Sequence, residues 1–388
     1  MVFFGWKKSL YAVASVAVVS APLASAKENV LSNNDVLNLD LSVQHLWDDN
    51  FSRTQEPEAD EITTSSASIL FNKKIQKQNL HLSWRAVDYR YDQRGDLNAV
   101  TQEGEAKWLG QWGSRIKTDI EWTRSSHVVD RLEFADKDIV VRDDAKAMIG
   151  YGTGDRLTIY IGGRQTKQKH WNDLREDLDY DEDEAFIEGT YKTALKSTLT
   201  LRYKSGKRVY PIVSLNNPRD LDYDYDQIEL ESNWVLSQKT SISGLVAAYN
   251  RDGVVNDGSG GLVDLAFNWS PTEKLLFTTG VEYKQPAVGE IIDTPSEIKT
   301  GFFNAYWQIT SKIKLGTDVR YSHQTYDQTS LVEERTEELY NYSPITIIYT
   351  PWESTQLRLD TTWVDNQSPV LYRDFVSKQV MLGLRWRF

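Results

Sequence analysis

The chain has 388 residues, no cysteine and a formal net charge of −12. The missing thiols exclude disulfides, zinc–thiolate sites and cysteine nucleophiles, and the acidity argues against a nucleic-acid partner. A mean hydropathy of −0.51 fits both a soluble protein and an outer-membrane barrel, because only alternate residues of a barrel strand meet lipid. The 13 Trp and 20 Tyr residues favour the barrel, whose two membrane interfaces carry aromatic girdles.

The first residues have the features of a secretory leader. Lys7 and Lys8 precede the apolar stretch Leu10–Val19, and Ala24-Ser25-Ala26 follows as a cleavage site of small residues. The apolar stretch is too short to span a bilayer as a helix. The sequence therefore predicts a signal peptide over residues 1–26 and a single outer-membrane barrel domain over residues 27–388.

Segments of alternating polarity then recur along the whole chain. In the first, Leu37, Leu39, Leu41 and Val43 alternate with polar residues, and similar segments follow at 80–86, 116–122, 199–203, 228–234, 263–269 and 357–363. Such alternation predicts strands with one face in lipid and one face in a polar interior.

The connections between these segments alternate in length. Short polar turns are expected near Lys74, Gly113, Gly154, Leu195, Gln238, Thr272, Lys312 and Trp352. Longer connections rich in Asp, Asn, Gly and Pro are expected at 51–61, 126–137, 168–180, 205–223, 251–260, 285–298 and 325–335. Short turns on the periplasmic side and long loops on the extracellular side are typical of bacterial outer-membrane barrels.

The spacing of the turns predicts the number of strands. A repeat of about 40 residues also occurs in propellers, but each unit here holds two long strands instead of four and we find no shared residue motif. The predicted fold class is therefore all-β: a transmembrane antiparallel up-and-down β-barrel of about 18 strands, with 16 as the alternative.

The C-terminal segment reads as the closing strand. Val380, Leu382, Leu384, Trp386 and Phe388 share one face, opposite polar and small residues. An apolar outer face is required where the last strand closes the barrel in lipid. The segment also resembles the C-terminal signal, ending in Phe, by which the barrel-assembly machinery recognises its substrates.

The segment from Leu39 to Arg53 carries a narrower resemblance. It is similar to the opening strand and first loop of outer-membrane porins encoded in exopolysaccharide gene clusters, in particular the exosortase-associated extracellular polysaccharide biosynthesis transporter family. The matching residues are Asp48, Asp49, Asn50, Phe51, Ser52 and Arg53, and Ser52 departs from the pattern. The match covers about fifteen residues, and it implies a role in the export or assembly of a secreted exopolysaccharide.

If the apolar faces meet lipid, charged residues on the opposite faces line the lumen. The candidate lumen-lining residues are Arg85, Arg202, Lys204, Glu229, Glu231, Asp264, Glu282, Arg320, Arg358, Asp360 and Arg385. Their mixed charge suits a water-filled channel for polar solutes. The simpler interpretation is that each of them only fills and hydrogen-bonds the lumen wall.

The sequence also offers partial patterns for a calcium loop and for a hydrolase site. Asp177, Asp179, Asp181 and Glu188 follow the spacing of a calcium loop, but Glu182 stands where its tight turn needs glycine. A barrel hydrolase would need a nucleophile, a base and an orienting acid together. The five histidines are His45, His81, His127, His170 and His323. The neighbours Ser126-His127 and Ser322-His323 do not provide such a set, because adjacent strand residues face opposite sides.

The sequence thus predicts a non-enzymatic, channel-forming protein of the Gram-negative outer membrane that takes part in exopolysaccharide export or assembly. A general or oligosaccharide uptake porin and a barrel hydrolase are the alternatives. We expect no cofactor and no metal. The expected partners are outer-membrane lipid, a polysaccharide or oligosaccharide solute, the barrel-assembly machinery and periplasmic export components.

Overall fold

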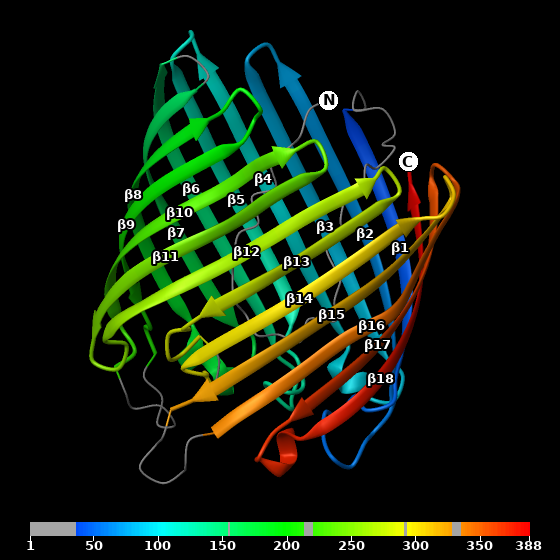
Figure 1. Ribbon diagram of the computed structural model, residues 1–388. Coiled ribbons are helices and arrows are strands. Elements are labelled where there is room, and N and C mark those ends of the chain that lie inside the picture. Colours follow the sequence, from blue (N-terminus) through cyan, green and yellow to red (C-terminus); the bar gives the residue numbers. More distant parts are fainter. Residues whose placement is uncertain (1–35, 154–155, 213–219, 291–292, 328–334) are drawn as a thin grey trace.

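The computed structural model is a closed antiparallel barrel of 18 strands (Figure 1). It describes residues 36–153, 156–212, 220–290, 293–327 and 335–388, so the predicted signal peptide lies outside the described residues. Each strand pairs with its neighbours in the sequence, and β1 also pairs with β18. The prediction of 18 strands is therefore confirmed, and the alternative of 16 is wrong.

The strands are long enough to cross a bilayer when tilted. Their bounds are β1 Leu37–Asp48, β2 Asp60–Ile75, β3 Gln78–Tyr91, β4 Ala99–Trp112, β5 Ile116–Val128, β6 Ile139–Thr153, β7 Leu157–His170, β8 Tyr180–Lys192, β9 Thr198–Val209, β10 Tyr223–Ser237, β11 Thr240–Gly253, β12 Gly258–Thr272, β13 Leu275–Lys284, β14 Glu297–Gln308, β15 Ile313–Tyr326, β16 Arg335–Trp352, β17 Thr355–Gln367 and β18 Phe375–Arg387.

The two ends of the barrel differ as predicted. The short turns lie at one end, together with the start of β1 and the end of β18, and most of the longer loops lie at the other end (Figure 1). The long connection predicted at 251–260 is an exception, because strand pairing takes up both of its ends and leaves only residues 254–257. The loops hold three short 3₁₀ helices, η1 Gly95–Leu97, η2 Asp173–Leu178 and η3 Leu371–Arg373. No helix among the described residues has the length and apolar character needed to cross a membrane.

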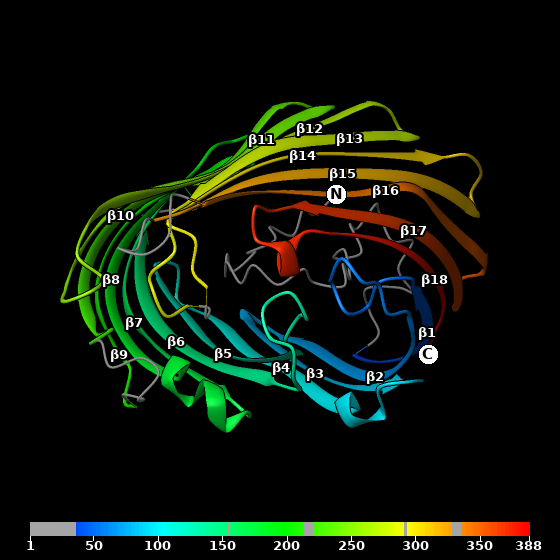
Figure 2. The same cartoon turned by 90° about the horizontal axis from the view of Figure 1, so that it is seen from below.

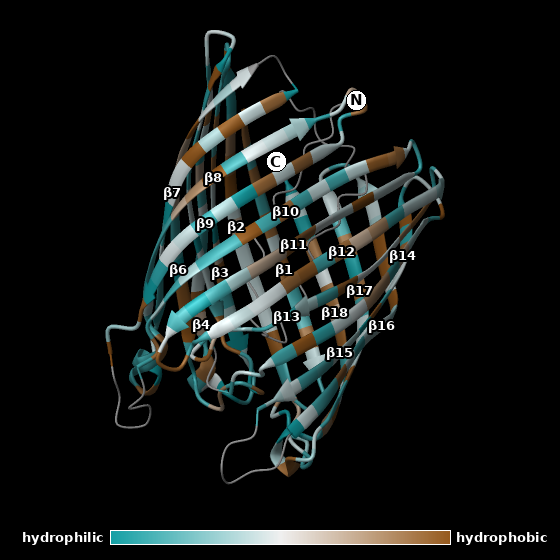
Figure 3. Ribbon diagram, turned by 60° about the vertical axis from the view of Figure 1, so that its left-hand side comes forward, coloured by the Kyte–Doolittle hydropathy of each residue, from teal (hydrophilic) through white to brown (hydrophobic). Residues whose placement is uncertain are grey.

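Along the strands, apolar side chains are exposed and polar side chains are buried, which is the reverse of the pattern in a soluble protein. On β8, Ile187 exposes 49% of its surface while the next residue, Glu188, exposes 4%. On β7, Ile159 and Ile161 are exposed while Thr158 is buried. The same alternation colours the ribbon in Figure 3. Apolar side chains therefore point outward along the strands and polar ones inward, which is the arrangement expected of a barrel in lipid.

Aromatic residues form a girdle at the periplasmic end of the apolar belt. Even-numbered strands end there in exposed tryptophans, namely Trp112, Trp234, Trp269, Trp307, Trp352 and Trp386. The indole ring suits the boundary between hydrocarbon and head groups, because its body is apolar and its N–H is polar.

The closing strand has the predicted apolar outer face. Val380, Leu382, Trp386 and Phe388 are exposed. Phe388 exchanges two backbone hydrogen bonds with Leu39 (2.8 and 3.0 Å), and these bonds extend the β1–β18 pairing to the end of the chain. The role of this strand as an assembly signal stays a prediction.

One strand carries a proline without breaking the barrel. Pro344 lies within β16, and the pairing register between β16 and β17 shifts between Tyr342 and Thr346. Proline has no N–H to give to the ladder, so it is tolerated at such an irregularity.

Candidate functional site

The barrel encloses a large polar cavity. Its volume is about 3740 Å³, and it extends from the periplasmic turns to the level of Tyr180, Arg208 and Arg251 near the extracellular ends of the strands. Among the described residues that line it, 20 carry Lys or Arg side chains and 12 carry Asp or Glu side chains. The interior is thus basic although the whole chain is acidic.

The wall formed by β8, β9 and β10 holds a row of charges. The strand register places Arg202 of β9 directly between Glu188 of β8 and Glu229 of β10. Arg202 bonds Glu188 at 2.5 Å and Glu229 at 2.6 Å. Lys204 also bonds Glu229, at 2.7 Å. These buried charges are matched within the wall, so the row keeps fixed dipoles at the lumen surface without a large local net charge.

Higher on the same wall, Arg208 is surrounded by carboxylates and rings. It bonds Glu182 at 2.6 Å and Glu290 at 3.1 Å. Its guanidinium also lies over the rings of Tyr180 (4.2 Å) and Tyr223 (5.5 Å). Glu290 belongs to the loop between β13 and β14, so this arginine fastens that loop to the wall.

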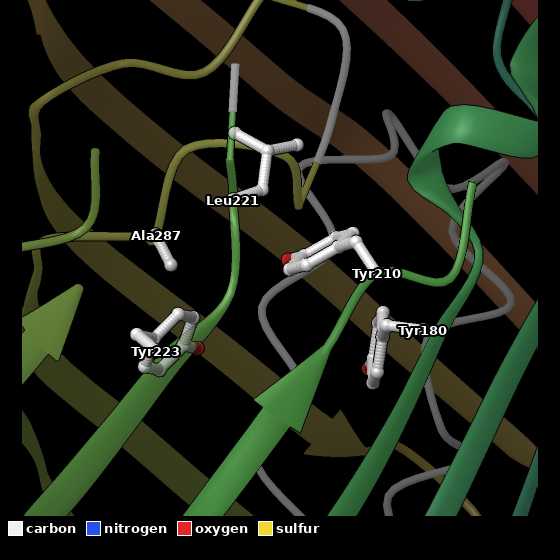
Figure 4. Close-up of a cluster of buried hydrophobic side chains, with 5 residues drawn as sticks. All are labelled: Tyr180, Tyr210, Leu221, Tyr223 and Ala287. Carbon is white, nitrogen blue, oxygen red and sulfur yellow. The ribbon is translucent and has the colours of Figure 1, made fainter. Parts of the chain in front are cut away.

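A hydrophobic cluster reinforces the attachment (Figure 4). It packs Tyr180, Tyr210 and Tyr223 from the strand ends against Leu221 and Ala287 from two extracellular loops. Burial raises the pKa of the Tyr210 hydroxyl to about 12, which is consistent with its place in an apolar cluster. The loop after β13 is thereby folded into the lumen, where Figure 2 shows it in yellow.

The first extracellular loop is fastened on the opposite wall. Arg53, in left-handed backbone geometry (φ 58°), bonds Asp48 at 2.8 Å and lies over the Phe375 ring. Asn50 donates to the carbonyl of Val376 on β18, and Phe51 is buried. The residues that carry the family resemblance therefore form a loop anchor that ties β1 to β18.

The loop between β5 and β6, residues 129–138, curls into the lumen (Figure 2). Arg131 lies 5.3 Å from the ring of Phe51, Glu133 pairs with Arg175, and the carbonyl of Leu132 accepts from Arg373 at 3.2 Å. This segment, called the inner loop below, is thus held by three other loops and narrows the extracellular half of the lumen.

Arg373 links the inner loop to the barrel wall. It bonds Glu337 of β16 at 2.7 Å, and the side chain of Glu337 exposes only 1% of its surface. Within the inner loop, burial raises the pKa of Asp130 and of Glu133 above their ordinary values. The extracellular constriction therefore combines a buried ion pair with carboxyl groups whose charged form is disfavoured by burial.

Nine of the eleven candidate lumen-lining residues line the cavity. They are Arg202, Lys204, Glu229, Glu231, Asp264, Glu282, Arg320, Arg358 and Arg385. Arg85 and Asp360 are not among the described residues that line it. Arg85 lies beside Glu103 (3.4 Å), and Asp360 is buried against Thr346 (2.7 Å) and Arg358. Whether any of these residues contacts a passing solute stays a prediction.

One histidine–carboxylate pair is buried among the extracellular loops. His170 bonds Asp138 at 2.7 Å, and both side chains are almost completely buried, next to Arg175. Its other ring nitrogen lies near Gln168. A second histidine, His45 of β1, lies between the hydroxyl of Thr63 (2.9 Å) and the carboxylate of Glu61 (3.0 Å). Within the described part of the chain, no cluster of His, Asp and Glu could hold a metal ion.

The periplasmic turns share one feature that the sequence analysis did not predict. A basic residue directly precedes an odd-numbered strand in most periplasmic turns, at Lys77, Arg115, Arg156, Lys239, Lys274 and Lys312. Its backbone carbonyl accepts an N–H from the following hairpin in each case. Aligning the sequence on the predicted strand starts would have shown this pattern.

Known proteins with this architecture were found by structure and not by sequence. No family model and no curated protein matches the chain. The outer-membrane protein OpdK of Pseudomonas aeruginosa, solved with vanillate, is similar at a TM-score of 0.51 and 10% identity, over 91% of this chain and 99% of that one. OccK2 (OpdF) of the same species, solved with glucuronate, is similar at a TM-score of 0.50 and 10% identity, over 91% and 95%.

OccAB4 of Acinetobacter baumannii gives a TM-score of 0.51 at 10% identity, over 91% of this chain and 99% of that one. At such identity the likeness concerns the fold alone. This likeness in fold, the outward apolar belt and the closed sheet together identify the chain as a β-barrel of the Gram-negative outer membrane.

Proposed function

We propose that this barrel is a passive channel through which small hydrophilic solutes, anionic ones above all, cross the outer membrane. The observation that carries the proposal is the cavity of about 3740 Å³ with its surplus of basic over acidic lining residues. Rings of Lys and Arg favour anions in pores.

Two further observations support a small solute. The inner loop and its neighbours narrow the extracellular half of the lumen. The similar proteins OpdK and OccK2 were solved with vanillate and glucuronate, each of which carries one carboxylate. A carboxylate on a sugar-sized body would find both basic side chains and exposed polar groups in this lumen.

The test is single-channel recording of the refolded protein in a planar lipid bilayer, with liposome swelling as a second assay. We expect a steady conductance, and faster swelling with glucuronate than with an uncharged sugar of the same size. A correctly folded barrel without conductance would contradict the proposal. Equal rates for the two sugars would contradict its anionic preference.

Export of an exopolysaccharide is the second candidate. The observation in its favour is that the periplasmic turns line the cavity, whereas the loops that fold into the lumen come from the extracellular end (Figure 2). A chain end could therefore enter from the periplasm. Current blockade by long polysaccharide fragments added only on the periplasmic side would favour this function over uptake, and blockade by short fragments alone would count against it.

A further inference from the structure

The periplasmic mouth of the lumen carries lysines at equivalent positions. Lys77, Lys239, Lys274 and Lys312 each occupy the last position of a turn, and all four are exposed and line the cavity. They are called the mouth lysines below. Arg115, at the same position of another turn, points instead to the outer girdle, where it bonds the hydroxyl of Tyr151.

Three of the four mouth lysines are held without being neutralised. The Nζ of Lys77 donates to the carbonyl of Gly113 (2.8 Å), that of Lys239 to Pro271 (2.7 Å) and that of Lys312 to Pro351 (2.9 Å). Each lysine thus reaches over to the next turn. In the described part of the chain, none of these three has a carboxylate within ion-pairing distance, so their charge stays available to the mouth.

The opposite end of the barrel has the opposite charge. The described residues of the extracellular loops include 20 Asp and Glu side chains against six Lys and Arg side chains. The described residues of the periplasmic turns include two acidic side chains, Glu273 and Glu353, against seven basic ones. An ion crossing the channel therefore passes from an acidic end to a basic end.

Such an arrangement has a known physical consequence. A mouth lined by one sign of charge concentrates its counter-ions, on the order of tenfold or more in a narrow opening. With acidic and basic ends in series, both ion species accumulate inside when anions are driven in at the basic end. The pore then conducts better in that direction than in the other.

We infer that the mouth lysines form an anion-collecting site at the periplasmic entrance and make the channel rectify. The inference rests on the proposed channel function and names its ligands as organic anions, carboxylated sugars among them. Net flow still follows the concentration gradient. The lysines determine from which side of the membrane anions enter the channel faster when a voltage is applied.

The experiment compares the full-length mature protein with the variant K77Q/K239Q/K274Q/K312Q, both inserted from one side of a planar bilayer. The control K73Q/K167Q/K169Q/K207Q removes the same charge from lysines that do not line the cavity. At about 0.1 M KCl, where the Debye length is about 10 Å, we expect larger current when anions enter from the periplasmic side. At about 1 M KCl, with a Debye length of about 3 Å, the asymmetry should fade.

The mouth variant should lose the rectification and shift the reversal potential away from anion selectivity, while the control keeps both. Symmetric current in the unaltered protein, or equal rectification in the mouth variant, would overturn the inference. Binding of pyranine, a dye with three sulfonates, to the folded protein in detergent provides a second readout. If the barrel does not conduct, the channel proposal fails. Equal dye binding by the mouth variant would then overturn the anion site separately.

Discussion

The two ends of this barrel are built on different principles. At the extracellular end, loops are fastened to one another and to the walls by buried pairs such as Arg373–Glu337 and Arg53–Asp48. At the periplasmic end, short turns are linked by backbone hydrogen bonds and carry exposed lysines. One end therefore owes its shape to buried side-chain contacts, whereas the other owes it to short turns and to backbone hydrogen bonds between neighbouring hairpins.

The largest effect should follow from removing the inner loop. Replacing residues 130–137 by a two-residue Asn-Gly turn would delete the segment that curls into the lumen, and we expect conductance to rise severalfold. The matched change at the other end, replacing the turn 193–197 by Asn-Gly, should leave conductance nearly unchanged. Single-channel recording measures both, and equal conductance in the two variants would mean that the loop does not restrict the pore.

Arg373→Met should lower the free energy of unfolding, because it breaks a buried ion pair at the extracellular end. It removes the closest cationic partner of the buried Glu337, which keeps Arg335 at 3.3 Å and a hydrogen bond from Ser368. A buried charge left wholly unpaired costs about 3–5 kcal/mol, so we expect a loss below that range. Denaturant unfolding in detergent micelles, followed by tryptophan fluorescence, would measure the loss. Arg94→Met, which removes an exposed pair with Asp96 at the same end, is the control and should unfold like the unaltered protein. A similar midpoint for both variants would show that Arg373 is not an anchor.

Lowering the pH should stabilise the packing of the inner loop at the extracellular end. Burial raises the pKa of Asp130 and of Glu133 from their ordinary values of 3.8 and 4.5. A raised carboxyl pKa means that packing is most stable below the ordinary value and weakens as pH rises through the raised one. We expect open-channel noise from the inner loop to fall as pH is lowered from 7 to 4, and the double variant D130N/E133Q to lose this dependence. Unchanged dependence in that variant would assign it to other groups.

The smallest effect on stability should come from a single periplasmic lysine. Lys239→Gln removes one carbonyl contact at an exposed turn, and surface changes of this kind usually fall within about 0.5 kcal/mol. Its unfolding midpoint should match that of the unaltered protein, although its anion selectivity falls slightly. A marked destabilisation would show that the turn end is also held by side chains.

Much of the fold could be predicted because it follows from local periodicity. Outward residues such as Ile228 and Trp269 alternate with inward ones in strands where the sequence predicts alternation. The turns near Gly113, Gln238 and Lys312 fall between strands as predicted. The strand number follows from the turn spacing, since each pair of turns encloses one hairpin.

The constriction could not be predicted in the same way. Its contacts join residues far apart in the sequence, as with Arg373 and the carbonyl of Leu132, and no periodicity relates them. For the same reason, alternation indicated that Arg85 and Asp360 face inward but not that the cavity would fail to reach them. The stretch from Asp48 to Arg53 carries a family resemblance in the sequence, but its role as a loop anchor is visible only in the structure.

The backbone bonds between successive periplasmic turns have a consequence for how such a barrel could change size. The carbonyl of Lys77 accepts from Gln111, that of Lys239 from Ser270 and that of Lys312 from Thr350, so neighbouring hairpins meet through one repeated joint. A hairpin inserted or removed between two such joints would find the same partners on either side. The hairpin is therefore a module, and duplication of a single hairpin could widen the barrel by two strands without inventing a new type of contact.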